Sequence, residues 1–179
     1  MIYLIGGPGR SGKTTLAKKV LQRQSVPFLS TDMVFDTVMN AIPEFGLNYE
    51  LNNMERAVKF KPFLQALINS TNALRGEIDD YLIEGVDILP SSLKDLEVKQ
   101  VTAVFLGFSD ITAEKLIETG SEIDYFKDLT PKEQDEFIEN MLELSKQLKD
   151  ECEAYGFEYF DLSKGWEVQI EKAYQFLVH

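Results

Sequence analysis

Residues 6 to 15 read GGPGRSGKTT and follow directly on the apolar run MIYLI. From Gly7 to Thr14 this stretch has the spacing G-x-x-x-x-G-K-[ST], in which a glycine-rich turn joins a strand to a helix. Glycines let such a turn wrap tightly and direct successive backbone N–H groups inward at the helix N-terminus, where they attract an anion. The motif therefore predicts a nucleoside-triphosphate site, and it requires a strand before it and a helix after it.

The side chains of the turn have separate expected roles. We expect Lys13 to reach the β- and γ-phosphates of ATP, and the Thr14 hydroxyl to ligate Mg²⁺. The alternative is an ordinary tight turn with a chance Lys-Thr pair, and the motif does not say what the nucleotide is used for. The full set of predicted nucleotide contacts is Gly7, Pro8, Gly9, Arg10, Ser11, Gly12, Lys13, Thr14 and Thr15.

The chain is acidic, with 18 Lys and Arg against 30 Asp and Glu and a net charge of −12. Nucleic acids and anionic membranes bind basic patches, so neither is expected as a partner. No apolar stretch approaches the roughly 20 residues that span a bilayer. The first residues lack the basic start of a secretory signal, which favours a cytoplasmic location. With Cys152 and His179 as the only residues of their types, a Cys/His metal cluster is excluded.

Short apolar runs alternate with helical patterns along the chain, which predicts a parallel sheet with crossover helices in a single α/β domain of 179 residues. Pro62 is a predicted kink or boundary within a helix over residues 53–74. Thr130, Pro131 and Glu133 predict a capping box that begins another helix. The predicted strands are residues 2–5, 27–30, 81–86, 101–107 and 157–160, with further helices over 13–23 and 31–41.

Acidic residues stand at the ends of two predicted strands. In a doubly wound sheet these ends share one edge with the glycine turn, so Asp32 is expected to face the γ-phosphate, as a base or as a ligand of Mg²⁺ through water. The alternative is that Thr31 or Asp32 caps the next helix. Glu84 lies inside an apolar strand, where an unpartnered charge is costly, so it needs Mg²⁺, water or a basic partner such as Arg56. We expect Glu84, with Asp32, to contact the acceptor; a buried ion pair without chemistry is the alternative. Asp87 is expected to be a cap before Pro90.

A nucleotide site of this kind serves GTPases, motor ATPases and small-molecule kinases, which differ in the further residues they need. A GTPase needs an Asn-Lys-x-Asp motif, which the chain lacks. A motor ATPase needs a longer chain and a strand that ends in paired acids. A small-molecule kinase needs a phosphate cradle, a carboxylate near the acceptor hydroxyl and a segment that excludes water, and the sequence fits these needs.

The glycine turn, the strand that ends Ser30-Thr31-Asp32 and the strand Ile83-Glu84-Gly85-Val86 together resemble the nucleoside-monophosphate-kinase-like group of P-loop phosphotransferases. This group includes adenylate, shikimate, gluconate and chloramphenicol kinases, and the pattern is most similar to its 2-phosphoglycerate-kinase-like branch. The resemblance implies a three-layer α/β/α P-loop NTPase fold with a five-stranded parallel sheet in the order 2-3-1-4-5. It also implies ATP, Mg²⁺ and Asp32 as the base on the acceptor side.

The same resemblance divides the single domain, residues 1–179, into parts. An acceptor-binding helical insert is expected over about residues 40–78, and a lid-like segment over about residues 108–130. The insert holds two of the four arginines, Arg56 and Arg75, and favours Arg56 as a contact for an anionic small-molecule acceptor. A solvated helix face with local pairs, such as Glu55 with Lys59, is the alternative.

One feature departs from this group. Its kinases carry arginines in the lid, and such a group stabilises the transferring phosphoryl group, whereas this chain has no arginine after Gly107. Lys115, Lys127, Lys132 or Arg10 are the substitutes that the sequence offers. Phosphotransfer from Mg·ATP to a small hydroxyl- or phosphate-bearing metabolite is therefore the leading prediction. An ATP-binding regulatory protein and a nucleoside-monophosphate kinase are the alternatives.

Overall fold

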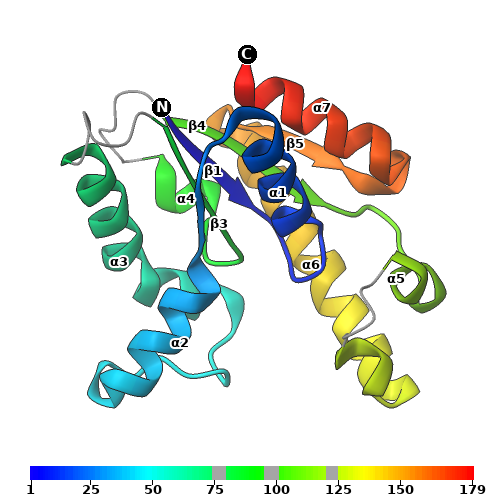
Figure 1. The fold of residues 1–179 in the computed structure, drawn as a ribbon. Helices are drawn as coiled ribbons and strands as arrows, with labels where there is room; N and C mark the ends of the chain where they lie inside the picture. Colours follow the sequence, from blue (N-terminus) through cyan, green and yellow to red (C-terminus); the bar gives the residue numbers. More distant parts are fainter. Residues whose placement is uncertain (74–79, 95–100, 120–124) are drawn as a thin grey trace.

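The computed structural model of the chain describes residues 1–73, 80–94, 101–119 and 125–179. Its centre is one five-stranded sheet in the order β2-β3-β1-β4-β5, and every neighbouring pair is parallel (Figure 1). The predicted fold class and strand order are therefore confirmed. The strands are β1 (Ile2–Gly6), β2 (Phe28–Ser30), β3 (Tyr81–Gly85), β4 (Val101–Gly107) and β5 (Glu158–Asp161).

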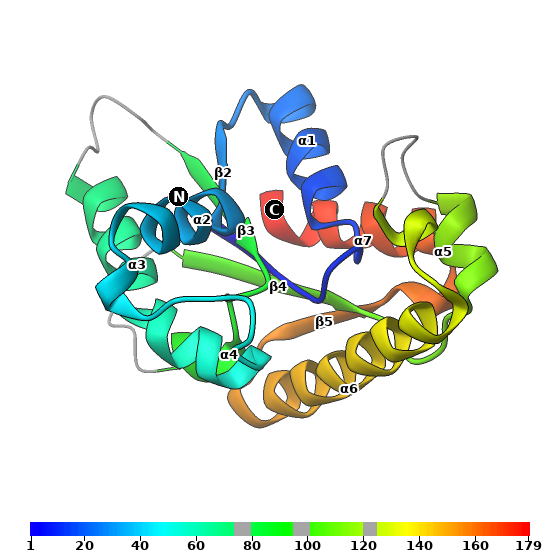
Figure 2. The same cartoon turned by 90° about the horizontal axis from the view of Figure 1, so that it is seen from below.

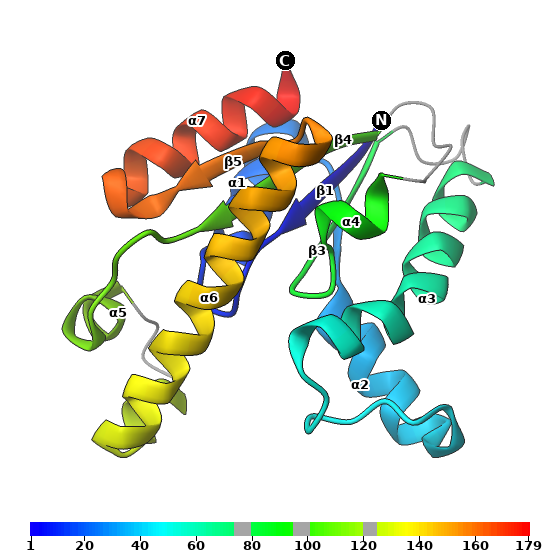
Figure 3. The same cartoon turned by 180° about the vertical axis from the view of Figure 1, so that it is seen from behind.

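Helices cover both faces of the sheet, as crossover connections between parallel strands require. Figure 1 shows α1 and α7 over one face, and Figure 3, from behind, shows α4 and α6 over the other. The α-helices are α1 (Lys13–Gln24), α2 (Thr31–Ala41), α3 (Asn53–Ala73), α4 (Pro90–Leu93), α5 (Ala113–Thr119), α6 (Pro131–Tyr155) and α7 (Trp166–Val178). The described residues also form the short 3₁₀ helices η1 (Pro43–Phe45), η2 (Tyr125–Asp128) and η3 (Leu162–Lys164).

The core divides into two clusters because successive residues of a strand point to opposite faces of a sheet. On β1, Ile2 and Leu4 pack with buried residues of α2, α3, α4 and α6. The intervening Tyr3 and Ile5 pack with buried residues of α1, α5 and α7. The near-continuous apolar strands of the sequence are thus explained by burial on both faces.

Local signals set several helix ends. The Thr130 side chain accepts a bond from the Glu133 backbone while the Glu133 side chain accepts one from the Thr130 backbone, so the capping box is confirmed. Pro62 lies inside α3, so it is not a helix boundary. Among the described residues, no helix is both long and apolar enough to cross a membrane. Arg75 of the expected acceptor-binding insert and part of the lid-like segment, residues 120–124, lie outside the described residues.

Candidate functional site

The glycine loop (residues 7–14) lies at the carboxyl end of β1 and leads into α1. Figure 2 shows this end of the molecule, with α2 and α3 on one side of the loop and α5 and α6 on the other. Gly12 has φ 77°, a left-handed conformation that glycine adopts without strain. A Cβ on Gly12 would lie 3.1 Å from the Trp166 ring, and one on Gly9 would lie 3.5 Å from the Phe137 ring. The loop is therefore held closely by α6 and α7.

Lys13 is buried at the start of α1, with 6% of its surface exposed. Its Nζ donates to the Pro8 carbonyl at 2.7 Å, which keeps the ammonium inside the loop. Burial lowers the pKa of Lys13, while the charges of Glu84 and Asp32 oppose that shift. Desolvation makes this ammonium a strong attractor for a phosphate, because little water screens it.

Ser11 adds a second polar group to the interior of the loop. Its side chain is fully buried, and its hydroxyl has no hydrogen-bond partner within the described residues. Buried polar atoms are rarely left without a partner, and those that are call for an explanation such as a missing ligand or water. The donor chemistry of the loop, with Lys13 and the Ser11 hydroxyl, fits a triphosphate.

Glu84 lies on β3 beside the loop, between Ile5 of β1 and Ser30 of β2. It is 2% exposed, and its Oε1 accepts a hydrogen bond from the Thr14 hydroxyl at 3.0 Å. Burial raises the pKa of Glu84, and the Lys13 charge and the Thr14 bond oppose that shift. Of the options considered for Glu84, Arg56 pairs with Asp87 and Asp32 instead, and Glu84 is stabilised by the Thr14 hydroxyl and the Lys13 charge.

Asp32 lies in the first turn of α2, at the end of β2. Ser30 occupies the N-cap position and no side chain makes a capping bond, so neither Thr31 nor Asp32 caps this helix. A Cβ on Gly85 would lie 1.7 Å from the Thr31 hydroxyl oxygen, so the start of α2 is pressed against the end of β3. The Asp32 side chain is 56% exposed and lies at the same edge of the sheet as Glu84.

Arg56, on α3, makes a bidentate ion pair with Asp87. Its Nε donates to Asp87 Oδ1 at 2.6 Å, and its Nη2 donates to Asp87 Oδ2 at 3.2 Å and to Asp32 Oδ1 at 3.3 Å. The Asp87 side chain is 1% exposed. Burial raises the pKa of Asp87, and the bonds from Arg56 oppose that shift. The expectation that Asp87 is a cap before Pro90 is therefore wrong: it is the buried partner of Arg56.

Two aromatic rings complete this cluster. The Arg56 guanidinium carbon lies 3.7 Å from the centre of the Phe35 ring and 6.0 Å from that of the Tyr49 ring. The alternative pair of Glu55 with Lys59 is replaced by other bonds, because Lys59 donates to the Gly46 carbonyl at 3.0 Å. Sequence reasoning missed Asp87, Phe35 and Tyr49 as members of the site. The one available signal was a second acid three residues after Glu84 in an apolar stretch.

Arg10 has φ 63°, an uncommon conformation for a residue other than glycine. Its Nη2 donates to the Leu116 carbonyl of α5 at 2.5 Å, and its guanidinium lies 5.0 Å from the centre of the Phe126 ring. Arg10 thus joins the glycine loop to α5 and η2. The arginine of the glycine loop is therefore directed toward the lid-like segment, residues 108–130.

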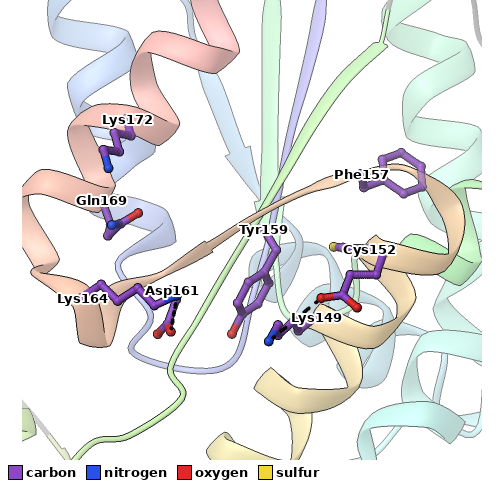
Figure 4. Close-up of a pocket in the computed structure, with 9 residues that line it drawn as sticks. Lys149, Cys152, Phe157, Tyr159, Asp161, Lys164, Gln169 and Lys172 are labelled. Carbon is purple, nitrogen blue, oxygen red and sulfur yellow. Dashed lines mark ion pairs between the residues drawn. The ribbon is translucent and has the colours of Figure 1, made fainter.

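Two hollows near these elements differ in kind. A cavity of about 110 Å³ adjoins the glycine loop, lined by Pro8, Gly9, Val86, Phe137, Asn140, Met141 and Leu144. A larger one of about 440 Å³ lies beside β5, one of the two edge strands of the sheet, and we call it the β5 pocket. Figure 4 shows its Lys149 on α6, its Tyr159 on β5, and its Lys164, Gln169 and Lys172 on η3 and α7. Burial raises the pKa of Cys152, which also lines it, to about 12, so this thiol is not a ready nucleophile.

Within the described residues, no group of three or more His, Cys, Asp or Glu side chains is placed to hold a metal ion. Mg²⁺ does not need such a group, because it is commonly held by one or two carboxylates, water and the phosphates of a nucleotide. The Thr14 hydroxyl and the carboxylates of Glu84 and Asp32 are oxygen donors at one edge of the sheet. This donor set fits Mg²⁺ bound together with a nucleotide.

Comparisons with known proteins bear on the fold. No protein-family model matches this chain, and no curated protein matches it. Among solved structures, shikimate kinase from Bacteroides thetaiotaomicron has a TM-score of 0.59 at 17% identity, over 98% of this chain and 94% of that one. A gluconokinase from Sinorhizobium meliloti 1021 has a TM-score of 0.57 at 17% identity, over 98% and 90%.

A third solved structure is shikimate kinase from Acinetobacter baumannii in complex with shikimate. It has a TM-score of 0.53 at 19% identity, over 97% of this chain and 88% of that one. These proteins share the five-stranded parallel architecture with this chain over nearly its whole length. At this level of identity the likeness establishes the fold, and the chemistry has to be argued from the residues of this chain.

Proposed function

We propose that the protein is an ATP-dependent phosphotransferase that moves the γ-phosphate of Mg·ATP to a hydroxyl group of a small molecule. The observation that carries this proposal is the convergence of buried Lys13, the Thr14–Glu84 bond and Asp32 at one edge of the sheet. A purely structural turn would not need a buried ammonium beside a buried carboxylate, since each is costly to desolvate. The pKa shifts of Lys13 and Glu84, both caused first by burial, lie in this cluster and favour a functional site.

The glycine loop supplies the nucleotide contacts in this proposal. Its backbone N–H groups and the Ser11 hydroxyl bind the β-phosphate region, and Lys13 stabilises negative charge on the γ-phosphate. Thr15, exposed on the first turn of α1, borders the same anion. Arg10 is not aimed at these phosphates in the present conformation, because its guanidinium contacts α5. Gly7, Pro8, Gly9 and Gly12 contribute shape rather than charge.

Mg²⁺ would be held by the Thr14 hydroxyl, with Glu84 and Asp32 as the nearby carboxylates. When bound, it neutralises charge on the β- and γ-phosphates. The sequence predicts Asp32 as a metal ligand and both Asp32 and Glu84 as acceptor contacts; in this proposal Glu84 lies on the metal side instead. Glu84 is bonded to Thr14 and therefore belongs with the nucleotide, whereas Asp32 is more exposed and contacts Arg56 on the acceptor side.

The transfer step requires one bond to form and one to break. The acceptor oxygen bonds to the γ-phosphorus while the bond from that phosphorus to the β,γ-bridging oxygen breaks, which releases ADP. The acceptor proton passes to the Asp32 carboxylate, directly or through one water. Asp32 suits this role because it is exposed at the sheet edge and is held by a single bond from Arg56.

A second candidate is an ATP-binding regulatory protein without efficient transfer. It is favoured by one observation, the lack of any arginine after Gly107. The third candidate, a nucleoside-monophosphate kinase, needs free basic groups for the second phosphate. It is disfavoured because the Arg56 fork is bonded to Asp87.

The test is ADP release from Mg·ATP across a panel of sugars, polyols, sugar acids, nucleosides and nucleoside monophosphates, with wild type and Asp32→Asn side by side. We expect one class of acceptor to stimulate turnover, and Asp32→Asn to lower it by about a hundredfold or more, as for a lost general base. ATP affinity should stay within about threefold, since Asp32 is not a main phosphate contact. Tight ATP binding without stimulation by any acceptor would favour the regulatory candidate instead.

A further inference from the structure

The positive charge of Arg56 is balanced by carboxylates of the protein itself. Three of its bonds go to carboxylates, two to the buried Asp87 and one to Asp32, while one face of its guanidinium lies on the Phe35 ring. The Arg56 side chain is only 14% exposed. The planar fork that would grip a carboxylate or a phosphate is therefore occupied by Asp87.

The neighbouring lysines of α3 do not replace it. Lys59 donates to the Gly46 carbonyl at 3.0 Å, which directs its ammonium toward the loop after η1. Lys61 is five residues beyond Arg56, which places it about 140° around the helix, at 3.6 residues per turn. The ion pairs of Arg56 thus set one guanidinium against two carboxylates, those of Asp32 and Asp87. Lys13, whose charge also interacts with both carboxylates, is held inside the glycine loop by its bond to the Pro8 carbonyl.

We infer that the acceptor is a neutral hydroxyl compound, without a carboxylate or a phosphate at the Arg56 side of the site. This inference rests on the proposed function and narrows its acceptor class. An anionic group would meet the Asp32 carboxylate, and to reach Arg56 it would have to leave Asp87 buried without its partner. A neutral hydroxyl group avoids both the repulsion from Asp32 and the loss of the Arg56–Asp87 pair, because it donates a hydrogen bond to Asp32 and leaves that pair intact.

Tyr49 is consistent with such an acceptor. Its side chain is 64% exposed, and its hydroxyl donates to Asp36, one helical turn after Asp32 on α2. The uncharged Tyr49 ring therefore lies at the border of the Arg56, Asp87 and Asp32 cluster. Rings of this kind pack against the C–H faces of polyhydroxylated molecules without requiring a charged partner.

The first test does not depend on turnover. The chain has four arginines, so the ¹⁵N side-chain Nε spectrum is simple, and Arg56→Lys identifies the Arg56 signal. Acetate and methyl phosphate are titrated in, with Arg23 as the internal reference because it pairs with Glu171 at the surface. We expect the Arg56 signal to move no more than that of Arg23 in wild type, and to move clearly in Asp87→Asn. A saturable shift of Arg56 in wild type would overturn the inference, whether or not the variant folds.

The second test uses matched acceptors that differ by one charge, such as glucose with gluconate and a nucleoside with its monophosphate. We expect kcat/KM for the neutral member to be higher by about tenfold or more, as like-charge repulsion at a site implies. Preference for the anionic member would overturn the inference while the proposed function stands. Absence of turnover with every acceptor would instead remove the proposed function, and the arginine titration would still decide whether Arg56 accepts an anion.

Discussion

The β5 pocket and the glycine loop both contain lysine, and a comparison of the two shows why only the loop resembles a phosphate site. The β5 pocket is the larger, with Lys149, Lys164 and Lys172 around it (Figure 4). Lys149 and Lys164 are 56% and 72% exposed, and they pair loosely with Glu153 at 4.0 Å and with Asp161 at 3.6 Å. The glycine loop offers a single lysine that is almost wholly buried.

Lys13 differs from the lysines of the β5 pocket in its burial and in the backbone geometry around it. Charges in water are screened, and exposed ion pairs contribute little to stability. Lys13 lies where water is excluded, at the start of a helix whose N–H groups point the same way. The number of lysines is thus a poor guide to anion binding, and the following variants test that conclusion.

The largest effect is expected for Lys13→Ala. We expect this variant to weaken binding of Mg·ATP, and any transfer, by about a thousandfold, because the desolvated charge on the γ-phosphate is lost. Calorimetric titration with Mg·ATP measures the binding. Unchanged affinity would mean that the glycine loop is only a tight turn.

A large effect on stability is expected for Arg56→Ala. Removing the guanidinium leaves the buried Asp87 carboxylate without its ion-pair partner and with the Thr31 hydroxyl at 3.4 Å, which costs about 3 kcal/mol or more in the free energy of unfolding. Urea denaturation measures this cost. The matched control is Lys164→Ala, where the exposed pair with Asp161 should change the free energy of unfolding by less than about 1 kcal/mol. Equal costs for the two variants would show that Asp87 is not stabilised by Arg56.

A moderate effect is expected from pH. Because the folded protein raises the pKa of Glu84, its carboxylate gains a proton on acidification earlier than an ordinary glutamate with a pKa of 4.5. Below the raised pKa the protonated group is a poorer partner for Lys13 and for Mg²⁺. We therefore expect kcat/KM for Mg·ATP to fall as pH decreases, with a midpoint above 4.5.

The same shift fixes the sign of the stability change. Between the unfolded and the folded pKa of Glu84, the folded state binds more protons than the unfolded state, so this residue lowers stability as pH rises through that window. Glu84→Gln should remove both this slope and the acid limb of kcat/KM. An acid limb that persists in Glu84→Gln would assign it to another group.

The smallest effect is expected for Lys172→Ala in the β5 pocket. This side chain is exposed, and no backbone cradle accompanies it, so Mg·ATP affinity and turnover should stay within about twofold of wild type. The same titration as for Lys13→Ala provides the measurement. A loss comparable to that of Lys13→Ala would place an anion site in the β5 pocket.

Much of the fold was predictable because its signals are local. The apolar runs gave the strands to within one or two residues, and the predicted range of the helix over residues 31–41 matches α2. Thr130 and Glu133 lie three residues apart, so their capping box could be seen in the sequence directly. Burial on both faces of the sheet made the strand runs continuous and therefore easy to identify.

The partners of the site were less predictable because they lie far apart in the chain. Thr14 and Glu84 are 70 residues apart, and Arg56 and Asp87 are 31 apart, so spacing says nothing about which acid meets which base. The sequence placed Glu84 and Asp87 near each other, yet only the packing of α3 against the end of β3 assigns Arg56 to Asp87. In a crowded cluster, the partner of a long side chain depends on how several helices and strands pack together.

The most direct measurement is ³¹P NMR of Mg·ATP incubated with a mixture of neutral hydroxyl acceptors and wild type, Lys13→Ala or Lys172→Ala. We expect ADP and a new phosphate monoester signal with wild type and Lys172→Ala, and neither with Lys13→Ala. Product formation that survives Lys13→Ala, or ATP that gives only inorganic phosphate with every acceptor, would contradict the assignment of this molecule as a phosphotransferase.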